Sequence, residues 1–157
     1  MKTIFTSLFL MGASVLMAQT PHALEKVTES QIDYWMLDTP ADLIWLADDA
    51  ALDADNDGSA DFTDLTEKMA ANYRLGADII FATNETAVDW NNDGTVDVND
   101  AAGLLSIGIN SKFMGHFDGQ YHSIQNAFQN ASKVALFNQI DGATIEKLRL
   151  LDFDFIS

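Results

Sequence analysis

The sequence predicts a mainly β fold that begins with an α-helical cap. Two acidic loops of twelve residues, 53–64 and 89–100, carry oxygen-bearing side chains at the spacing of calcium loops. Segments with helical patterning flank the first loop. From residue 107 onward, short apolar segments alternate with Gly, Asn and Asp, which is typical of short strands separated by turns. These features divide the chain into a cap region, residues 33–106, and a region of short strands, residues 107–157.

The first 18 residues have the pattern of an export signal. Lys2 provides a short positive segment, an apolar stretch follows, and Ala18 is a plausible cleavage point. The apolar run is short for a membrane span, and an uncleaved anchor is the alternative. Residues 19–32 are expected to be a lead-in. We therefore expect a secreted or bacterial cell-surface protein whose mature chain has no stable membrane span.

Composition narrows the possible partners. Cleavage leaves 139 residues without cysteine and changes the net charge from −16 to −17. A secreted chain without disulfides must be stabilised by its core, by metal or by repetition.

The strong acidity argues against nucleic acid and anionic membranes as partners. Nine of the 24 acidic residues lie in the two loops, so metal binding explains much of the charge.

The cap begins with a predicted strand over residues 33–38. A helix then follows, with Thr39 as its N-cap, Pro40 at the first helical position and Asp42 in the first turn. Residues 43–50 supply its apolar face. Residues 65–73 are also helical in character. The first loop is therefore expected between two helices, as in an EF-hand.

The second loop has different surroundings. Residues 72–81 are rich in β-branched and aromatic residues and predict a strand. Residues 82–88 do not form a convincing helix, and only a short helical candidate, 98–105, follows the loop. We therefore interpret the second loop as a calcium-filled insertion between strands rather than a full EF-hand.

Both loops offer oxygen ligands at positions 1, 3, 5, 7, 9 and 12. Position 7 contributes its carbonyl, and position 9 usually acts through water. Gly58 and Gly94 at position 6 supply the sharp turn. The predicted ligands of two calcium ions are Asp53, Asp55, Asp57, Ser59, Asp61 and Asp64 in the first loop, and Asp89, Asn91, Asp93, Thr95, Asp97 and Asp100 in the second.

The last ligand position departs from the usual EF-hand. Both loops have Asp at position 12, where an EF-hand has Glu. The shorter side chain predicts weaker binding, near the ~10⁻⁴–10⁻³ M of extracellular modules. The second loop resembles the calcium loop of dockerin modules, in which Asp at position 12 is normal. The alternative is that both loops are acidic turns without metal, closed by bonds to their own backbone.

The C-terminal region has the sequence pattern of short strands stacked in a repeating order. Ile124 and Ile145 lie 21 residues apart in similar settings, and a period near 20 with one short strand per turn is typical of a solenoid. The segments 113–124 and 135–145 resemble the repeat of bacterial GLUG-type surface proteins and adhesin-like proteins. The resemblance extends over residues 33–157. Ala135 and Asn138 replace both glycines of the family's namesake motif, which puts the turn geometry there in doubt.

The resemblance implies the start of a right-handed parallel β-helix on an exported bacterial protein, behind an EF-hand-like calcium-binding cap. A solenoid needs about three or more repeats and a cap to shield its core. Leu150, Phe153 and Phe155 would be exposed at the open end. The expectation is therefore that the chain is the N-terminal part of a longer protein, or that it pairs end-on with a partner.

Catalysis has little support in the sequence. His22, His116 and His122 lack metal-protease spacing, and no nucleophile elbow or P-loop is present. His122 is expected in a structural turn or stacking role. Asp118 is expected to fix a turn through its own backbone. The arginines have no acidic partner cluster that the sequence identifies, so this segment is expected to be non-catalytic.

The three tryptophans invite a comparison with carbohydrate-binding surfaces. Trp35 and Trp45 lie on apolar faces and are expected in the core. Trp90, at position 2 of the second loop, is expected to face outward. It is therefore the best sequence-based candidate for a contact with a glycan or a protein ligand.

Three functions follow from these patterns. The first is a calcium-binding surface protein used for adhesion or display. The second is a dockerin-like module that binds a cohesin in a polysaccharide-degrading assembly. The loops here start 36 residues apart with a strand between them, whereas dockerin loops recur at a short interval, each followed by a helix. The third is the head of a glycan-active enzyme of the β-helix class.

Overall fold

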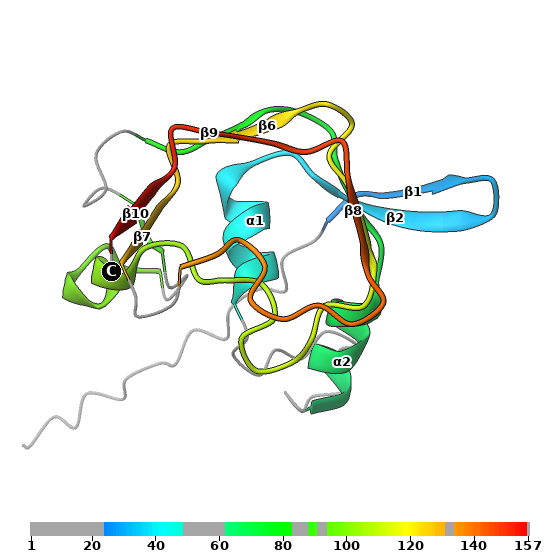
Figure 1. Cartoon of the computed structure of the whole chain (residues 1–157), viewed down its shortest axis with the longest axis horizontal. Helices are drawn as coiled ribbons and strands as arrows, with labels where there is room; N and C mark the ends of the chain where they lie inside the picture. The colour runs from blue at the N-terminus through cyan, green and yellow to red at the C-terminus, as the bar shows by residue number, and fades with distance from the viewer. Residues whose placement is uncertain (1–23, 49–61, 83–87, 91–93, 131–133, 157) are drawn as a thin grey trace, which may run out of the picture.

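The computed structural model of the chain describes residues 24–48, 62–82, 88–90, 94–130 and 134–156 (Figure 1). Its helices are α1 (Pro40–Ala47), α2 (Phe62–Ala70) and the 3-10 helix η2 (Val98–Ala102). Its strands are β1 (Lys26–Glu29), β2 (Ile32–Leu37), β3 (Tyr73–Leu75), β4 (Ile79–Ile80), β5 (His116–Asp118), β6 (Ser123–Gln125), β7 (Phe128–Asn130), β8 (Thr144–Glu146), β9 (Arg149–Leu151) and β10 (Asp154–Ile156).

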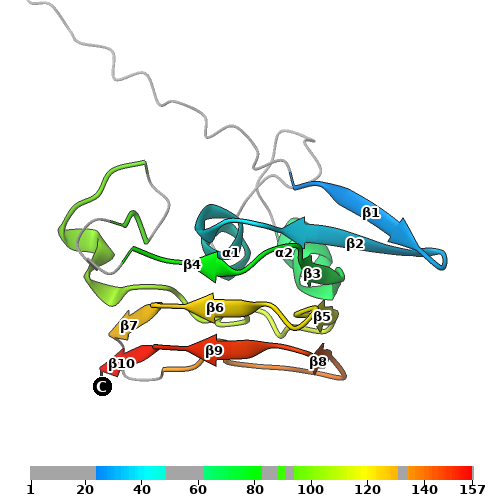
Figure 2. The same cartoon turned by 90° about the horizontal axis from the view of Figure 1, so that it is seen from above.

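The described strands form three sheets. The largest has the order β1-β2-β3-β5-β8, in which the β1–β2 hairpin is antiparallel and every other pair is parallel. The second is the parallel set β4-β6-β9, and the third is the parallel pair β7-β10. Seen edge-on, β5, β6 and β7 form one layer, and β8, β9 and β10 form a further layer beneath it (Figure 2).

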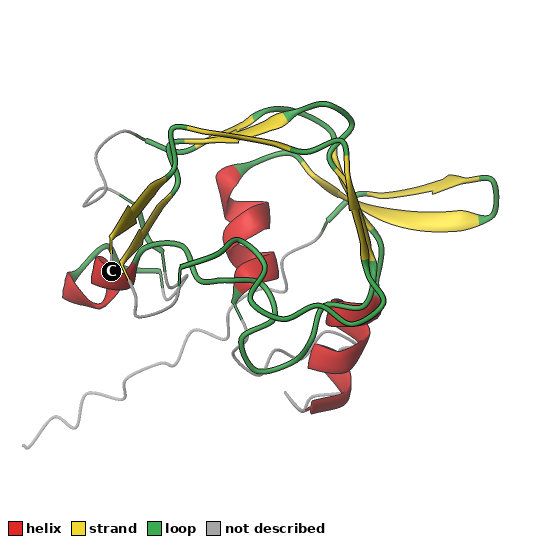
Figure 3. Cartoon of the chain, viewed as in Figure 1, coloured by secondary structure: helices red, strands yellow, loops and turns green. Residues whose placement is uncertain are grey.

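The helices and the strands occupy different parts of the molecule. In the view of Figure 3, β6 to β10 follow the sides of a closed outline that surrounds α1, and the β1–β2 hairpin projects away from it. In the edge-on view, α1 and α2 lie at the end of the stack opposite β8, β9 and β10 (Figure 2). The core therefore has helices over one end and an edge of short strands at the other.

Helix α1 begins as its sequence predicts. The Thr39 hydroxyl accepts the N–H of Asp42 at 3.3 Å, and the Asp42 carboxylate accepts the N–H groups of Thr39 at 2.7 Å and Asp38 at 2.8 Å. This capping box satisfies helix-terminal donors that would otherwise lack partners. Leu43 and Leu46 on its inner face are fully buried, which fixes the helix inside the outline.

The core continues along the strands as columns of side chains in register. Trp35, Tyr73 and Phe117 occupy equivalent positions on β2, β3 and β5. Ile79 and Ile124 do the same on β4 and β6. Each strand thus buries its apolar side chains against equivalent residues of the strand beside it, which is the main packing contact between layers.

Two glycines between Phe113 and Ile124 allow the layers to approach. A Cβ on Gly115 would collide with the carbonyl oxygen of Ala71, and one on Gly119 would lie 2.6 Å from the carbonyl oxygen of Lys147. Gly119 instead donates its N–H to the carbonyl of Glu146 at 2.8 Å. The glycines of this segment are therefore required by close passage of the backbone.

The predicted fold class, a mainly β start of a right-handed parallel β-helix, is wrong. The described residues form a small α/β fold with two α-helices, one mixed sheet and two parallel sheets, and they build no long solenoid. An antiparallel hairpin starts the largest sheet, and side chains of α1 fill the interior. Several of the short apolar segments form strands, whereas residues 134–137 do not, and the sequence did not reveal how much of the core the helices supply.

Most individual elements agree with their predictions. The strand over 33–38, the helix after Thr39 and the helix near 65–73 correspond to β2, α1 and α2. The predicted strand over 72–81 is interrupted by residues 76–78 and becomes β3 and β4. Strand β1 lies within the expected lead-in. Among the described residues, no helix is long and apolar enough to span a membrane.

Candidate functional site

The described part of the second loop closes on itself through its first and last carboxylates. Asp89, at position 1, accepts the N–H of Gly94 at 2.8 Å. Gly94 has φ of +89°, the left-handed conformation that position 6 requires. The turn predicted from the glycine is confirmed at this position.

Asp100, at position 12, is buried within the loop that it closes. Its carboxylate accepts the N–H of Trp90 at 2.6 Å and the N–H of Asp97 at 2.8 Å. The first of these bonds joins position 12 to position 2, directly beside Asp89. The two ends of the loop are therefore held together, and the position-12 carboxylate is fixed at the start of η2.

Trp90 anchors this loop to the protein interior. Its side chain is 1% exposed and stacks on Phe81, with ring centroids 4.9 Å apart and an interplanar angle of 29°. The prediction that Trp90 faces outward as a contact for glycan or protein is therefore wrong. Burial of a large aromatic surface outweighs the tendency of position 2 to face solvent. Trp35 and Trp45 are partly buried against the core, as expected.

Only part of the predicted ligand set falls within the described residues. Asp89, Thr95, Asp97 and Asp100 are described, and Thr95 and Asp97 are exposed. The following predicted ligands lie outside the described residues, wholly or through their side chains: Asp53, Asp55, Asp57, Ser59, Asp61, Asp64, Asn91 and Asp93. Within the described part of the chain, no group of three or more His, Asp or Glu side chains is placed to hold a metal ion.

The donor chemistry of the second loop suits calcium. Its described ligand positions offer carboxylates and the backbone carbonyl of Thr95, and calcium takes six to eight such oxygen ligands. The two fixed carboxylates supply the first and last positions. Asn91 and Asp93 would add the oxygens of positions 3 and 5.

The first loop is flanked by helices that one buried lysine joins. Lys68 of α2 donates its ammonium group to the carbonyl oxygens of Trp45 at 2.5 Å and Asp48 at 2.6 Å, at the C-terminal end of α1. The ammonium also lies 4.4 Å from the centroid of the Trp45 ring. A cation at this helix end meets the negative end of the helix dipole. Lys68 thereby fixes the relative position of the two segments between which the first loop runs.

A shallow hollow that is open to solvent, of about 390 Å³, lies between the start of α1 and the entry to the second loop. Its wall is apolar except for Asp89. The lining residues are Pro40, Ala41, Ile44, Phe81, Ala82, Val88 and Asp89.

A second polar cluster lies on the largest sheet, centred on Arg74. Its guanidinium lies 2.7 Å from Glu29 and 3.6 Å from Asp118, and it covers the Tyr34 ring at 4.0 Å. Lys147 lies 3.5 Å from the same Asp118 carboxylate. The sequence did not identify these acidic partners of Arg74, because they are distant from it in sequence.

Asp118 combines a turn with these ion pairs. Its carboxylate accepts the N–H of Gln120 at 3.1 Å, which confirms the predicted turn role, and the Gln120 side-chain amide also donates to it. Burial raises the pKa of Asp118, but the bonds from Gln120 and the charges of Lys147 and Arg74 outweigh it. The pKa of this carboxyl therefore lies below its ordinary value.

The two described histidines occupy structural positions. His116 lies between the Tyr34 hydroxyl, 3.3 Å from Nδ1, and the Glu146 carboxylate, 3.2 Å from Nε2. His122 lies 3.5 Å from Asp78, which also accepts the backbone N–H and hydroxyl of Ser123. These bonds from Ser123 hold the pKa of Asp78 below its ordinary value. His122 is thus located at a turn, as expected.

No family model, no curated protein and no solved structure matches this chain.

Proposed function

We propose that this chain is an exported bacterial calcium-binding protein of the cell surface, used for adhesion or display and not for catalysis. Calcium binding is the central part of the proposal, with two ions as the expected number. Export is supported by the N-terminal signal pattern over residues 1–18.

The observation that carries the proposal is the closure of the second loop. Asp89 and Asp100 are the predicted first and last ligands, and the bond from Trp90 to Asp100 brings the ends of the loop together. Asp89 and Asp100 each accept N–H groups of the loop itself, which orients their oxygens. Preformed carboxylate positions support ion binding because less ordering remains to be done.

The position of this loop supports a structural role for calcium. Trp90 packs into the core beside Phe81, so an ion in the loop would be coupled to the packing of the whole fold. The chain carries a net charge of −16, and a divalent cation would reduce the repulsion among clustered carboxylates. A ligand that binds only the folded state raises its stability by mass action, so even a weak site stabilises the fold when the calcium concentration exceeds the dissociation constant.

The alternatives have less support from the geometry. A dockerin-like module would need a helix after each loop, whereas a short 3-10 helix follows the second loop, and β3 and β4 lie between the loops. The glycan-enzyme alternative gains no support from the two described histidines, which are held in structural contacts.

A matched pair of variants tests the proposal through stability. At a dissociation constant of ~10⁻⁴–10⁻³ M, 10 mM calcium should stabilise the chain by roughly 1.4–2.7 kcal/mol for each site. Asp89→Asn should remove much of the contribution of the second loop because it removes a direct anionic ligand. Asp154→Asn makes the same charge change on β10 and should retain the full effect.

Thermal melts with and without calcium provide the measurement, and magnesium at the same concentration serves as a control for ionic strength. Equal calcium responses from Asp89→Asn and Asp154→Asn would contradict the assignment of the second loop.

A further inference from the structure

The second calcium loop is attached to the core by a pair of stacked aromatic rings. One ring belongs to Trp90, at position 2 of the loop, and the other to Phe81, eight positions before the loop begins at Asp89. Both side chains are buried, and the ring centroids lie 4.9 Å apart. A residue outside the twelve-residue pattern therefore contacts the loop directly.

Phe81 is itself held to the neighbouring layer of strands. Its N–H donates to the carbonyl of Gln125 on β6 at 3.1 Å. Its carbonyl accepts the side-chain amide of Asn126, the residue after β6, at 3.3 Å. Because both main-chain groups of Phe81 are bonded to this segment, its ring offers Trp90 a surface that is fixed to the sheet.

Trp90 connects this surface to the two ends of the loop. Its main-chain N–H donates to the carboxylate of Asp100, the predicted last ligand, at 2.6 Å. Trp90 also directly follows Asp89, the predicted first ligand. A displacement of Trp90 would therefore shift the first ligand through the covalent chain and break a hydrogen bond to the last.

We propose that Phe81 and Trp90 are positioning residues of the second calcium site, and that their stacking contact sets the affinity of this loop for calcium. The inference rests on the proposed calcium binding. A site that is correctly formed for only a fraction of the time has its apparent dissociation constant raised by the inverse of that fraction. Loss of the stack lowers this fraction, because it removes an attraction that holds positions 1 and 12 in place.

The coupling between the stack and the ion acts in both directions. If the stack favours calcium binding, then bound calcium favours the stack by the same free energy. Calcium in the second loop should therefore hold Phe81 more firmly against β6. The amide of Phe81, which is bonded to Gln125, reports on this effect.

The first test changes Phe81 and leaves all twelve residues of the loop unaltered. The background is the full chain carrying Asp53→Ala, which removes the predicted first ligand of the other loop, so that titration with calcium alone reports on the second loop. Phe81→Leu keeps an apolar side chain but removes the stacked ring. The dissociation constant measured by calorimetry should rise roughly threefold to tenfold, which corresponds to the strength of an aromatic pair.

Two substitutions of Trp90 provide a rescue test in the same background. Trp90→Phe retains a ring that can stack on Phe81 and should bind calcium with nearly the affinity of the background chain. Trp90→Leu removes the ring and should weaken binding as much as Phe81→Leu does. A residue that serves only to stabilise the fold would change the melting temperature without this pattern in the dissociation constant.

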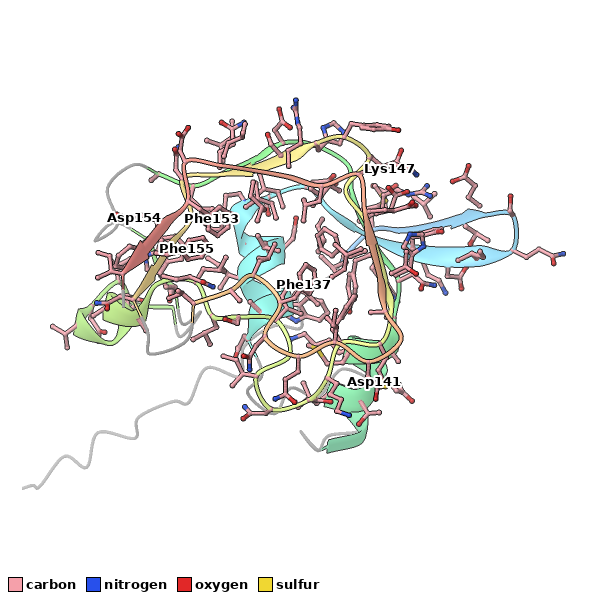
Figure 4. The ribbon with its side chains drawn as sticks, viewed as in Figure 1. Phe137, Asp141, Lys147, Phe153, Asp154 and Phe155 are labelled. Carbon is pink, nitrogen blue, oxygen red and sulfur yellow. The ribbon has the colours of Figure 1, made fainter. Side chains whose placement is uncertain are left out.

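Phe113→Leu is the matched control for a general loss of stability. Phe113 is fully buried, and its ring lies 5.3 Å from that of Phe137, which lies toward the inside of the outline (Figure 4). The same substitution at this position should lower the melting temperature and leave the calcium affinity of the second loop unchanged. Far-UV circular dichroism verifies that each variant is folded at the temperature of titration.

Amide hydrogen exchange tests the reverse direction and requires no substitution in the stack. Saturating calcium should slow exchange of the Phe81 amide in the background chain. An unchanged rate would overturn the proposal, even where Phe81→Leu or Trp90→Leu does not fold.

The titrations separate this inference from the proposed function. Calcium binding with equal dissociation constants in the background chain and in Phe81→Leu would overturn the positioning role and leave calcium binding intact. Equal losses of affinity from Phe81→Leu and Phe113→Leu would also overturn it, because they would reflect the stability of the whole fold. Absence of calcium binding in the background chain would overturn the second calcium site together with this inference.

Discussion

At the residue scale, Asp118 shows how one buried carboxylate joins several parts of the fold. It closes the turn after β5 through Gln120 and neutralises Arg74 and Lys147 from two other segments. Its side chain is 3% exposed, so these partners replace the water that the charge has lost. A buried charge of this kind is stable only while all of its bonds are made.

We expect Asp118→Asn to lower the free energy of unfolding at pH 7 by about 1.5–3 kcal/mol, typical of hydrogen bonds to a charged group. The pKa of Asp118 is depressed in the fold, so its contribution is present above the ordinary carboxyl pKa of 3.8 and is lost as the pH falls through the folded value. Urea unfolding at pH 7 and pH 3 measures the effect.

The difference between Asp118→Asn and the wild type should therefore shrink at pH 3. Asp141→Asn serves as the control because Asp141 forms an exposed ion pair with Lys112 at 3.1 Å. Its effect should remain within about 0.5 kcal/mol. A gap between Asp118→Asn and the wild type that does not change with pH would contradict the role given to its charge.

Contacts between residues that are close in sequence could be predicted, and contacts between residues that are distant in sequence could not. The Asp118 turn depends on a residue two positions away and was predicted. The ion pairs of Arg74 join residues 45 and 44 positions away, which no local pattern reveals. Trp90 was assigned to solvent from its loop position, and its burial depends on where Phe81 lies in the fold.

At the element scale, the two α-helices act as one unit. Lys68 of α2 is buried and donates to two carbonyl oxygens at the end of α1. It is followed by Met69, which is fully buried, so α2 is fixed both by packing and by hydrogen bonds. Lys68 therefore joins the C-terminal end of α1 to α2.

Lys68→Met tests this connection. Methionine retains much of the apolar stem but removes the two hydrogen bonds that the charged ammonium donates, so the free energy of unfolding should fall by about 2–3 kcal/mol. Lys112→Met, at an exposed ion pair, should change it by less than about 0.5 kcal/mol. Urea denaturation compares the two variants, and equal effects would show that Lys68 does not join the helices.

Elements with strong local signals could be predicted from the sequence, and others could not. Thr39, Pro40 and Asp42 form a start signal that is complete within four residues, and α1 begins there. Strand β1 has a polar sequence, and its hairpin turns through Ser30 and Gln31, both with positive φ. Neither residue is a usual turn signal in that conformation, so β1 could not be predicted from local sequence.

At the scale of the whole molecule, the two ends of the fold differ. Helices α1 and α2 lie at one end, and strands β8, β9 and β10 lie at the other (Figure 2). The sequence predicted short strands in the regions of β5, β6, β8 and β9 but not β7, and it assigned them to a β-helix because a period near 20 does not show what covers the ends of a stack. The helices that cover one end of this core are distant from these strands in sequence.

The candidate calcium site could be predicted from spacing alone because twelve consecutive residues carry the whole pattern. The structure adds two features of the second loop. The N–H groups of Trp90 and Asp97 donate to the Asp100 carboxylate, and Gly94 has a positive φ. The attachment of this loop to the core through Trp90 could not be predicted, because it depends on the fold around Phe81.

Calorimetric titration of the chain with calcium tests the central claim most directly. The account predicts two equivalents bound, with dissociation constants near ~10⁻⁴–10⁻³ M. Circular dichroism recorded in parallel should show a higher melting temperature as the sites fill. Absence of binding at millimolar calcium would mean that both loops are acidic turns closed by their own backbone, and the proposed calcium-dependent function would be wrong.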